Sequence, residues 1–407
     1  MKTKIIALAT LCVTAATVSL YPAHKTIGAL IAGPPVVPTQ LVPFQPVLPL
    51  TNTRPSIEVV FVLDTTGSMG GLIEAAKEKI WSIATTMASA DTAPEIKIGL
   101  VAYRDRGDAY VTRVVDLSSD LDSMYATLMD FQADGGGDGP ESVNQALYDA
   151  VHHISWSQDP NSYRVVFLVG DAPPHMDYQD DVKYPVTMQA AVERGIVVNT
   201  IQCGDYAATG AQWQQIAQLT QGRYFQVDQA GSAVAIATPF DARLASLSQE
   251  LDKTRLFYGD KAEKAKQREK VRATEKLHAG ASLASRARRA TFNASASGNT
   301  NLLGDHDLAV DVVSGKVDLS AVEAEQLPEP MQTMSLAQKK DLIAHTTARR
   351  AELQSQIREL SAQRGNYLDD RVDAAGGANE SLDYKVFSAI RDQAEEKGLV
   401  YDGGPEY

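Results

Sequence analysis

The sequence predicts an α/β protein in which a doubly wound, mostly parallel sheet is followed by a mainly α-helical C-terminal region. Apolar runs alternate with helical stretches through the first half of the chain, and helical spacing dominates the second half. The 407 residues, 44% of them hydrophobic, suffice for two cores, and this composition excludes collagen-like, disulfide-knot and wholly disordered chains. We divide the chain into four segments: an N-terminal signal peptide or anchor at 1–31, a proline-rich linker at 32–55, a domain of alternating strands and helices at 56–235, and a helical C-terminal region at 236–407.

The N-terminus has the composition of an export signal. Lys2 and Lys4 precede a weakly polar to apolar run over 5–20, which suits a secretory signal better than a full membrane span. We expect 1–31 to be a signal peptide or an uncleaved membrane anchor, and a buried N-terminal helix is the alternative. Segment 32–55 holds seven prolines and is expected to be an extended linker. The protein is therefore expected in the periplasm, on the cell surface or secreted, with a membrane tether if the anchor stays.

The segment 56–235 alternates strands and helices joined by short turns. Near-continuous apolar runs such as 57–63 are typical of parallel strands that are buried on both faces. We expect strands at 57–63, 96–103, 111–115, 165–169, 196–201 and 224–227. Helices are expected at 72–88, 121–131, 142–154, 182–194 and 211–219. This alternation is typical of a doubly wound sheet.

Acidic residues fall in three loops of this segment. Asp64 and Asp171 each follow a central strand, and Asp138 lies in a Gly-rich loop. Ligands of open α/β sheets bind at the carboxyl ends of the strands. With the hydroxyls of Thr66 and Ser68, these carboxylates would form an all-oxygen site for Mg²⁺, or alternatively Ca²⁺ or Mn²⁺. The alternative is that Asp, Ser and Gly here only form turns and helix caps.

These loops also carry a family resemblance. The run Asp64-x-Thr66-x-Ser68 resembles the DxSxS motif of the von Willebrand factor A domain, and the Asp138 and Asp171 loops resemble its second and third metal loops. The resemblance implies a Rossmann-like sheet with a metal-ion-dependent adhesion site formed by these five residues. It further implies that a partner protein binds there by completing the coordination of the cation.

The second loop departs from the common family pattern. Most members have Thr where this chain has Asp138, although a hemicentin-like subset shares the Gly-Gly-Asp-x-Pro-Glu form. A third carboxylate should raise cation affinity, because ligand charge tunes it. The same charge should weaken the pull of the metal on an incoming acidic group.

Other motifs have simpler interpretations. His175 is a candidate for a hydrogen bond to metal-bound water, with a loop histidine of no such role as the alternative. The tripeptide Arg106-Gly107-Asp108 spells an integrin-recognition sequence, but its position after a strand favours an ordinary turn. No P-loop, GxSxG or HExxH motif is present, so we expect no enzyme, and a metal-dependent hydrolase is the less favoured alternative.

The C-terminal region reads as helical and strongly charged. Helices are expected at 241–257, 261–278, 335–367 and 382–397, with a strand-like patch at 308–313. From 253 to 289 there are twelve Lys or Arg against four Asp or Glu, in a chain of net charge −13. We expect this basic segment to be a solvated helix, or alternatively to contact acidic envelope polymers or the acidic A domain itself. The apolar stripe of 335–367 is too short for a long coiled coil and favours a helical hairpin or packing on the A domain.

Together these features predict an exported, divalent-metal-dependent module that binds a protein partner at the metal rim. The helix pattern of the C-terminal region also resembles the region that follows A domains in exported bacterial proteins. The alternative function is a scaffold or assembly subunit of a cell-envelope complex. The acidic net charge argues against nucleic acid as a partner.

Overall fold

The computed structural model describes residues 54–137, 139–230, 236–374 and 379–404. The predicted signal segment 1–31, all but the last two residues of the predicted linker, and Asp138 lie outside these ranges. Among the helices that are described, none has both the length and the apolar character that crossing a membrane requires.

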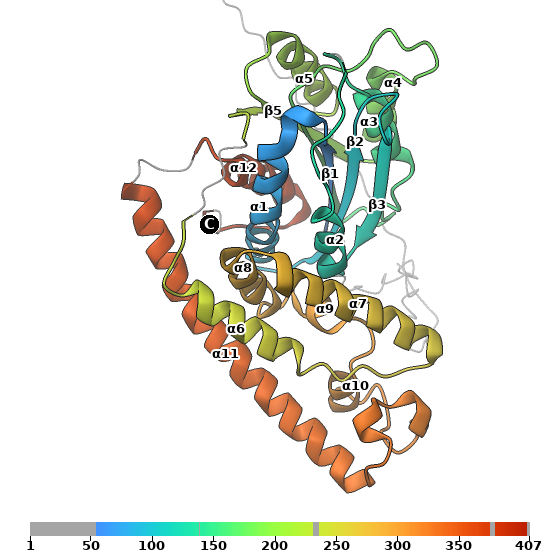
Figure 1. The fold of residues 1–407 in the computed structure, drawn as a ribbon, viewed down its shortest axis with the longest axis vertical. Helices are drawn as coiled ribbons and strands as arrows, with labels where there is room; N and C mark the ends of the chain where they lie inside the picture. Colours follow the sequence, from blue (N-terminus) through green and yellow to red (C-terminus); the bar gives the residue numbers. More distant parts are fainter. Residues whose placement is uncertain (1–53, 138, 231–235, 375–378, 405–407) are drawn as a thin grey trace, which may run out of the picture. The chain divides into compact units, whose positions relative to one another are not determined.

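A six-stranded sheet in the order β3-β2-β1-β4-β5-β6 forms the centre of the first half (Figure 1). All neighbouring pairs are parallel except β2 and β3, which are antiparallel. The predicted doubly wound, mostly parallel sheet is therefore confirmed. The strands are β1 (Ser56–Asp64), β2 (Glu95–Tyr103), β3 (Thr112–Ser118), β4 (Ser162–Gly170), β5 (Ile196–Cys203) and β6 (Tyr224–Val227).

Helices cover both faces of this sheet. Because side chains alternate along a strand, Val59 and Phe61 of β1 pack into one apolar cluster while Val60 and Val62 pack into another. The first cluster includes α1 and α2, and the second includes α3, α4 and α5. These helices are α1 (Gly70–Ala88), α2 (Leu121–Leu128), α3 (Val143–His152), α4 (Tyr184–Glu193) and α5 (Ala207–Leu219), and the short 3₁₀ turn η1 (Gly67–Met69) precedes α1.

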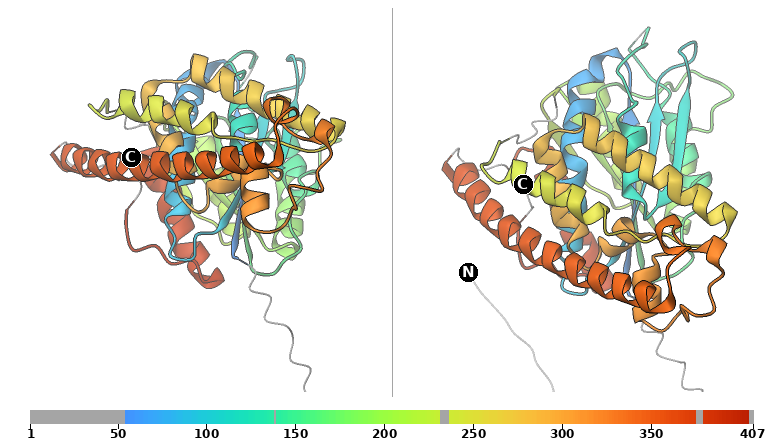
Figure 2. Two further views of the ribbon diagram at one scale, coloured as in Figure 1. Left: turned by 90° about the horizontal axis from the view of Figure 1, so that it is seen from below. Right: turned by 60° about the horizontal axis from the view of Figure 1, so that its bottom comes forward.

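The second half is helical, as predicted, and Figure 2 shows its longest helix, α11, lying alongside α6. Its α-helices are α6 (Asp241–Asp252), α7 (Lys261–Gly280), α8 (Leu283–Asn293), α9 (Asn299–Leu303), α10 (Leu308–Val313), α11 (Leu336–Ala374) and α12 (Leu382–Ala394). Three 3₁₀ turns complete it, namely η2 (Ala324–Gln326), η3 (Glu329–Met331) and η4 (Glu395–Lys397). Leu353 and Ile357 of α11 pack into a core shared with α6, α8 and α9. The apolar stripe of α11 thus packs against the other helices of a helical bundle.

The last helix, α12, returns to the sheet. Val386, Phe387 and Ile390 belong to the same apolar cluster as α1 and one face of β1. A buried ion pair joins Lys79 of α1 to Asp383 of α12 at 2.8 Å. Residues more than 300 positions apart therefore share one core, which the sequence pattern alone did not reveal.

Helix α7 of the basic segment 253–289 is largely solvated, with only Lys270, Thr274 and Leu277 buried, whereas other basic residues of the segment are buried against the sheet domain. Lys270 is 8% exposed and Arg289 is fully buried. Both reach acidic residues at α2: Lys270 lies 2.5 Å from Asp120, and the Arg289 guanidinium donates to both Asp122 carboxylate oxygens at 2.6 Å. The segment thus contacts the acidic sheet domain, which was the second of our sequence-based interpretations.

One element differs in type from its prediction. The patch 308–313 is the helix α10 and not a strand. Its β-branched residues favour strands, but the Asp307 side chain accepts a hydrogen bond from the backbone N–H of Val310 and caps a helix. Arg350 of α11 bonds the same carboxylate at 2.9 Å and holds the cap in place.

Candidate metal site

Asp64, the last residue of β1, lies at the carboxyl edge of the sheet and is fully buried. The backbone N–H and the hydroxyl of Thr66 donate to its Oδ1 at 2.9 and 2.7 Å. Its Oδ2 is buried and has no hydrogen-bond partner among the residues that the structure describes. Such an atom is costly unless a cation, a proton or a water molecule satisfies it.

Asp171, the first residue after β4, lies beside Asp64. The negative charge of Asp171 acts on the Asp64 carboxylate and raises its pKa. Gln229, two residues after β6, donates to Asp171 Oδ2 at 2.6 Å. Gly170, just before Asp171, allows the end of β4 to lie this close to Asp64. A Cβ at this position would lie 2.9 Å from the Asp64 Cβ and 2.4 Å from the Tyr103 hydroxyl.

The hydroxyl residues of the first loop differ in exposure. Thr66 is buried and Ser68 is exposed, and their hydroxyl oxygens are 3.5 Å apart. The loop between them bonds to the Gly-rich loop, because the Gly67 N–H donates to the Gly135 carbonyl at 3.1 Å. The Asp134 N–H donates in turn to the Thr65 carbonyl at 3.1 Å. The second loop is thereby joined to the first on the N-terminal side of Asp138.

The electrostatics of the site follow from burial and like charge. Burial raises the pKa of Asp64 to about 7; the hydrogen bonds from Thr66 oppose that rise and the charge of Asp171 adds to it. Burial also raises the pKa of Tyr103 well above its usual value, and Asp64, Glu141 and Asp171 raise it further. A cation would relieve this concentration of negative charge.

The residues fit a hard divalent cation in part. Two carboxylates and two hydroxyls from the predicted set lie at one edge of the sheet, and the orphaned Asp64 Oδ2 is an available oxygen. The described ranges hold no group of three or more His, Cys, Asp or Glu side chains that could hold a metal ion. The third predicted carboxylate, Asp138, falls in a gap between these ranges.

His175 lies against other partners than the predicted ligands. Its Nδ1 is 2.8 Å from Asp177 Oδ1 and its Nε2 is 3.4 Å from Asp105 Oδ2, and its ring stacks on Tyr178. A hydrogen bond from His175 to metal-bound water stays a prediction. The tripeptide Arg106-Gly107-Asp108 forms the predicted turn, with Gly107 at φ +94°.

Sequence reasoning missed four residues of this edge: Tyr103, Asp105, Glu141 and Gln229. Tyr103 and Asp105 stand at the end of β2, so the rule that pointed to Asp64 and Asp171 applies to them as well. Glu141 is the last residue of the Gly-Gly-Asp-x-Pro-Glu run of the second loop, and its sequence position alone indicated no function. Gln229 follows a short edge strand, and no motif marked it.

Comparison with known proteins assigns the sheet domain. Residues 58–239 match the family described as von Willebrand factor A domain. The chain contains a von Willebrand factor A domain.

Similarity to individual proteins is confined to part of each chain. The alpha-protein kinase vwkA of Dictyostelium discoideum is 31% identical over 121 residues, which are 29% of this chain and 19% of that protein. Mouse von Willebrand factor A domain-containing protein 7 is 36% identical over 125 residues, 31% of this chain and 13% of that protein. The chain thus spans less than a fifth of each of these relatives. A solved von Willebrand factor type A protein from Catenulispora acidiphila has 19% identity and a TM-score of 0.34, over 43% of this chain and 39% of that one.

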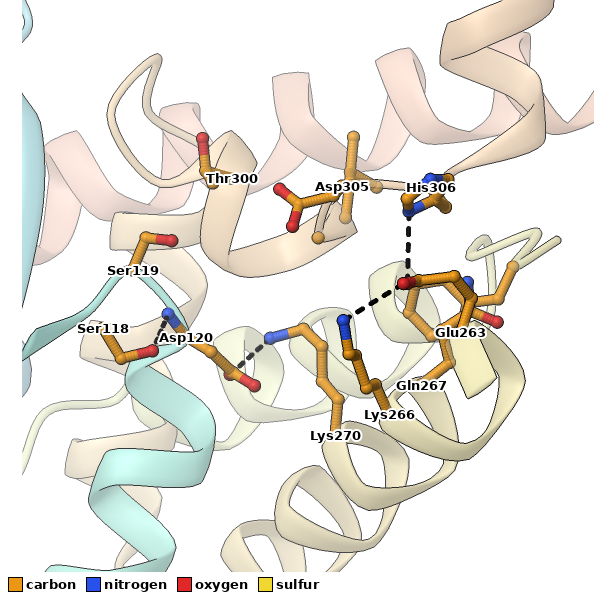
Figure 3. A pocket seen from close by; sticks show the side chains of 13 residues that line it. Ser118, Ser119, Asp120, Glu263, Lys266, Gln267, Lys270, Thr300, Asp305 and His306 are labelled. Atoms are coloured by element: carbon orange, nitrogen blue, oxygen red, sulfur yellow. Dashed lines mark hydrogen bonds and ion pairs between the residues drawn. The ribbon is translucent and has the colours of Figure 1, made fainter. Parts of the chain in front are cut away.

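A pocket of about 220 Å³ lies elsewhere, between the A domain and the helical region (Figure 3). It is lined by the end of β3 and the two residues that precede α2 on one side, and by α7, α9 and the loop after α9 on the other. Because β3 is antiparallel to β2, Ser118 stands at the edge of the sheet opposite Tyr103. The charges of the pocket pair with one another, as in Lys270–Asp120 at 2.5 Å and Lys266–Glu263 at 3.1 Å.

Proposed function

We propose that the protein is a divalent-metal-dependent protein-binding module, and that its partner docks at the carboxyl edge of the A domain sheet. An A domain points to a protein-interaction module in general. The finer proposal is supported above all by one observation: the fully buried Asp64 carboxylate has one oxygen without a hydrogen-bond partner among the described residues.

Each residue of the proposed site has a definite task. Asp64 and Asp171 supply carboxylate charge, Thr66 orients Asp64 through its hydroxyl, and Ser68 stands at the exposed side of the loop. Asp138 is the proposed third carboxylate. Mg²⁺ is the preferred cation, with Ca²⁺ or Mn²⁺ as alternatives, because every proposed ligand is an oxygen. Bound there, the cation would offer a positive charge that an acidic group of a partner protein can coordinate.

We further propose that the role is non-enzymatic and extracytoplasmic. The sequence carries no nucleophile motif, and its first 20 residues have the composition of an export signal. Cell fractionation of the tagged full chain tests the location, and N-terminal sequencing of the mature protein tests cleavage. Recovery of an uncleaved chain in the cytoplasm would contradict export.

The metal-dependent role is tested in two steps on the full chain. Calorimetric titration with Mg²⁺ should give saturable binding that is lost in Asp64→Asn and kept in Asp341→Asn, an exposed carboxylate on α11. Affinity capture from the native envelope fraction should then recover a partner in Mg²⁺ that is absent in EDTA and absent with Asp64→Asn. Equal capture in EDTA and in Mg²⁺ would refute a metal-dependent interface.

A further inference from the structure

Residues 104–108, in the loop between β2 and β3, contact all three loops of the candidate metal site and contribute none of the proposed ligands. Arg104 reaches the first loop, since its Nε donates to the Thr65 carbonyl at 3.1 Å. Asp105 and Asp108 reach the second loop, and Asp105 together with Arg106 reaches the third. No other described loop is bonded in this way to all three.

Both flanks of Asp138 are held by this loop. On the N-terminal side, the Gly136 N–H donates to Asp108 Oδ2 at 3.1 Å, and the Asp105 N–H donates to the same oxygen at 3.2 Å. On the C-terminal side, the Ser142 hydroxyl donates to Asp105 Oδ1 at 2.8 Å. Described residues on either side of Asp138, Gly136 and Ser142, are therefore each hydrogen-bonded to one of these carboxylates.

The loop after Asp171 is held by the other oxygen of the same residue. The Tyr178 hydroxyl donates to Asp105 Oδ2 at 2.8 Å, and His175 Nε2 lies 3.4 Å from it. The Tyr178 ring stacks on His175, with ring centroids 3.9 Å apart, and Arg106 Cζ lies 4.1 Å from the centroid of the Tyr178 ring. Arg106 also pairs with Asp180 at 2.9 Å and with Asp181 at 2.5 Å.

Asp105 joins these contacts because its two oxygens face different loops. Asp105 as a whole residue is 5% exposed, so its hydrogen bonds are shielded from competing water. A carboxylate accepts at both oxygens, whereas an amide accepts at only one. The two metal loops would thus lose a shared anchor if this single carboxylate were changed.

We propose that Asp105 is a positioning residue. Together with the backbone bonds from Glu141 N–H to the Pro173 carbonyl and from His175 N–H to the Glu141 carbonyl, it fixes the second metal loop against the third, and so tunes the cation affinity of the site. This inference rests on the proposed metal-dependent function. Partners that orient the ligands of a metal site without binding the metal typically contribute 10–100-fold to its affinity. Asp105 would act in that way through Ser142 and Tyr178.

The test compares Asp105→Asn with a matched control, Asp311→Asn, in the full chain. Asp311 is also 5% exposed and also accepts from a tyrosine hydroxyl, that of Tyr258, at 2.7 Å, but it lies in α10. Calorimetric titration with Mg²⁺, well below the melting temperature of each variant, should show at least tenfold weaker binding for Asp105→Asn and wild-type binding for Asp311→Asn. A merely structural role would lower the melting temperature of both variants and leave the Mg²⁺ affinity of both unchanged.

If Asp105→Asn does not fold, a second pair of variants with smaller structural changes gives the same test. Tyr178→Phe removes one hydroxyl that donates to Asp105 and keeps the stacked ring, while Tyr258→Phe removes the equivalent hydroxyl at Asp311. We expect about threefold weaker Mg²⁺ binding for Tyr178→Phe only. If wild type binds Mg²⁺ and the Asp105 and Tyr178 variants bind it equally well, the positioning role is wrong and the metal site stands. If wild type binds no Mg²⁺, the proposed function itself fails, and this inference fails with it.

Discussion

Two aspartates of the A domain, Asp64 and Asp122, are both fully buried, yet their surroundings shift their pKa values in opposite directions. Burial raises the pKa of Asp64 to about 7, with one carboxylate oxygen unpartnered within the described residues. Burial alone would also raise the pKa of Asp122, but Arg289, Lys270 and Arg255 lower it well below its ordinary value.

The difference lies in where the positive charge comes from. Asp122 receives cations of the chain itself, supplied by helices α7 and α8 and by the segment before them, and these contacts fasten the helical region to the A domain. The Arg289 contact is bidentate, with both nitrogen–oxygen distances at 2.6 Å. Asp64 has hydroxyl, amide and carboxylate neighbours instead. A buried carboxylate of the first kind is structural, whereas Asp64 is the carboxylate that we propose to bind a cation from solution.

The largest expected effect is the loss of the Asp122 carboxylate. Asp122→Ala leaves the fully buried Arg289 without its bidentate partner, although Asp252 still pairs with it at 2.9 Å. Breaking a buried pair by removing one partner costs about 3–5 kcal/mol. Urea unfolding monitored by circular dichroism should show this loss in the free energy of unfolding. A loss below about 1 kcal/mol would contradict the structural role assigned to Asp122.

The second effect is a pH dependence that arises from Asp64 in the metal-free protein. Because folding raises this pKa from about 3.8 to about 7, the folded protein binds the proton more tightly than the unfolded chain does. The contribution to stability is complete below about pH 3.8 and is lost as the pH rises through about 7. At about 1.4 kcal/mol for each pKa unit, the protonation of Asp64 contributes roughly 4 kcal/mol to the free energy of unfolding.

Urea unfolding in EDTA between about pH 5 and pH 8 measures this slope. Asp64→Asn should be flatter than wild type over that range, because the amide does not titrate. Saturating Mg²⁺ should restore wild-type stability at pH 8 and leave Asp64→Asn unchanged. Parallel curves for wild type and Asp64→Asn would show that Asp64 is not the titrating group.

The smallest expected effect concerns a solvent-exposed ion pair. It lies at the junction between the A domain and the helical region, as Asp122 does. Lys276 of α7 pairs with Asp130 at 2.7 Å, with side-chain exposures of 40% and 67%. Exposed pairs contribute about 0.2–1 kcal/mol, and salt screens them. Lys276→Gln should therefore lower the free energy of unfolding by less than about 1 kcal/mol, with no difference left in 1 M NaCl. A larger loss that persists in salt would mean that this pair, too, is effectively buried.

The sequence by itself determined the alternation of strands and helices, the parallel sheet and the edge at which Asp64 and Asp171 lie. These features depend on local periodicity and on the rule that parallel strands end at one edge, so no distant contact was needed to predict them. It misassigned 308–313, where the capping bonds of Asp307 outweighed β-branched propensity. Among the residues near the site, it missed Asp105 and Glu141, which the strand-end rule and the second loop could have indicated, and Gln229, which no motif marks.

Only the tertiary structure decided how the basic segment and α12 are used. A run of lysines and arginines has the same sequence whether it is solvated or paired, and its partners at α2 lie about 150 residues earlier in the chain. The same holds for Lys79 and Asp383, whose pairing depends on α12 returning to the sheet. Charge pairing and core packing across such separations depend on the folded geometry, which single-sequence periodicity does not encode.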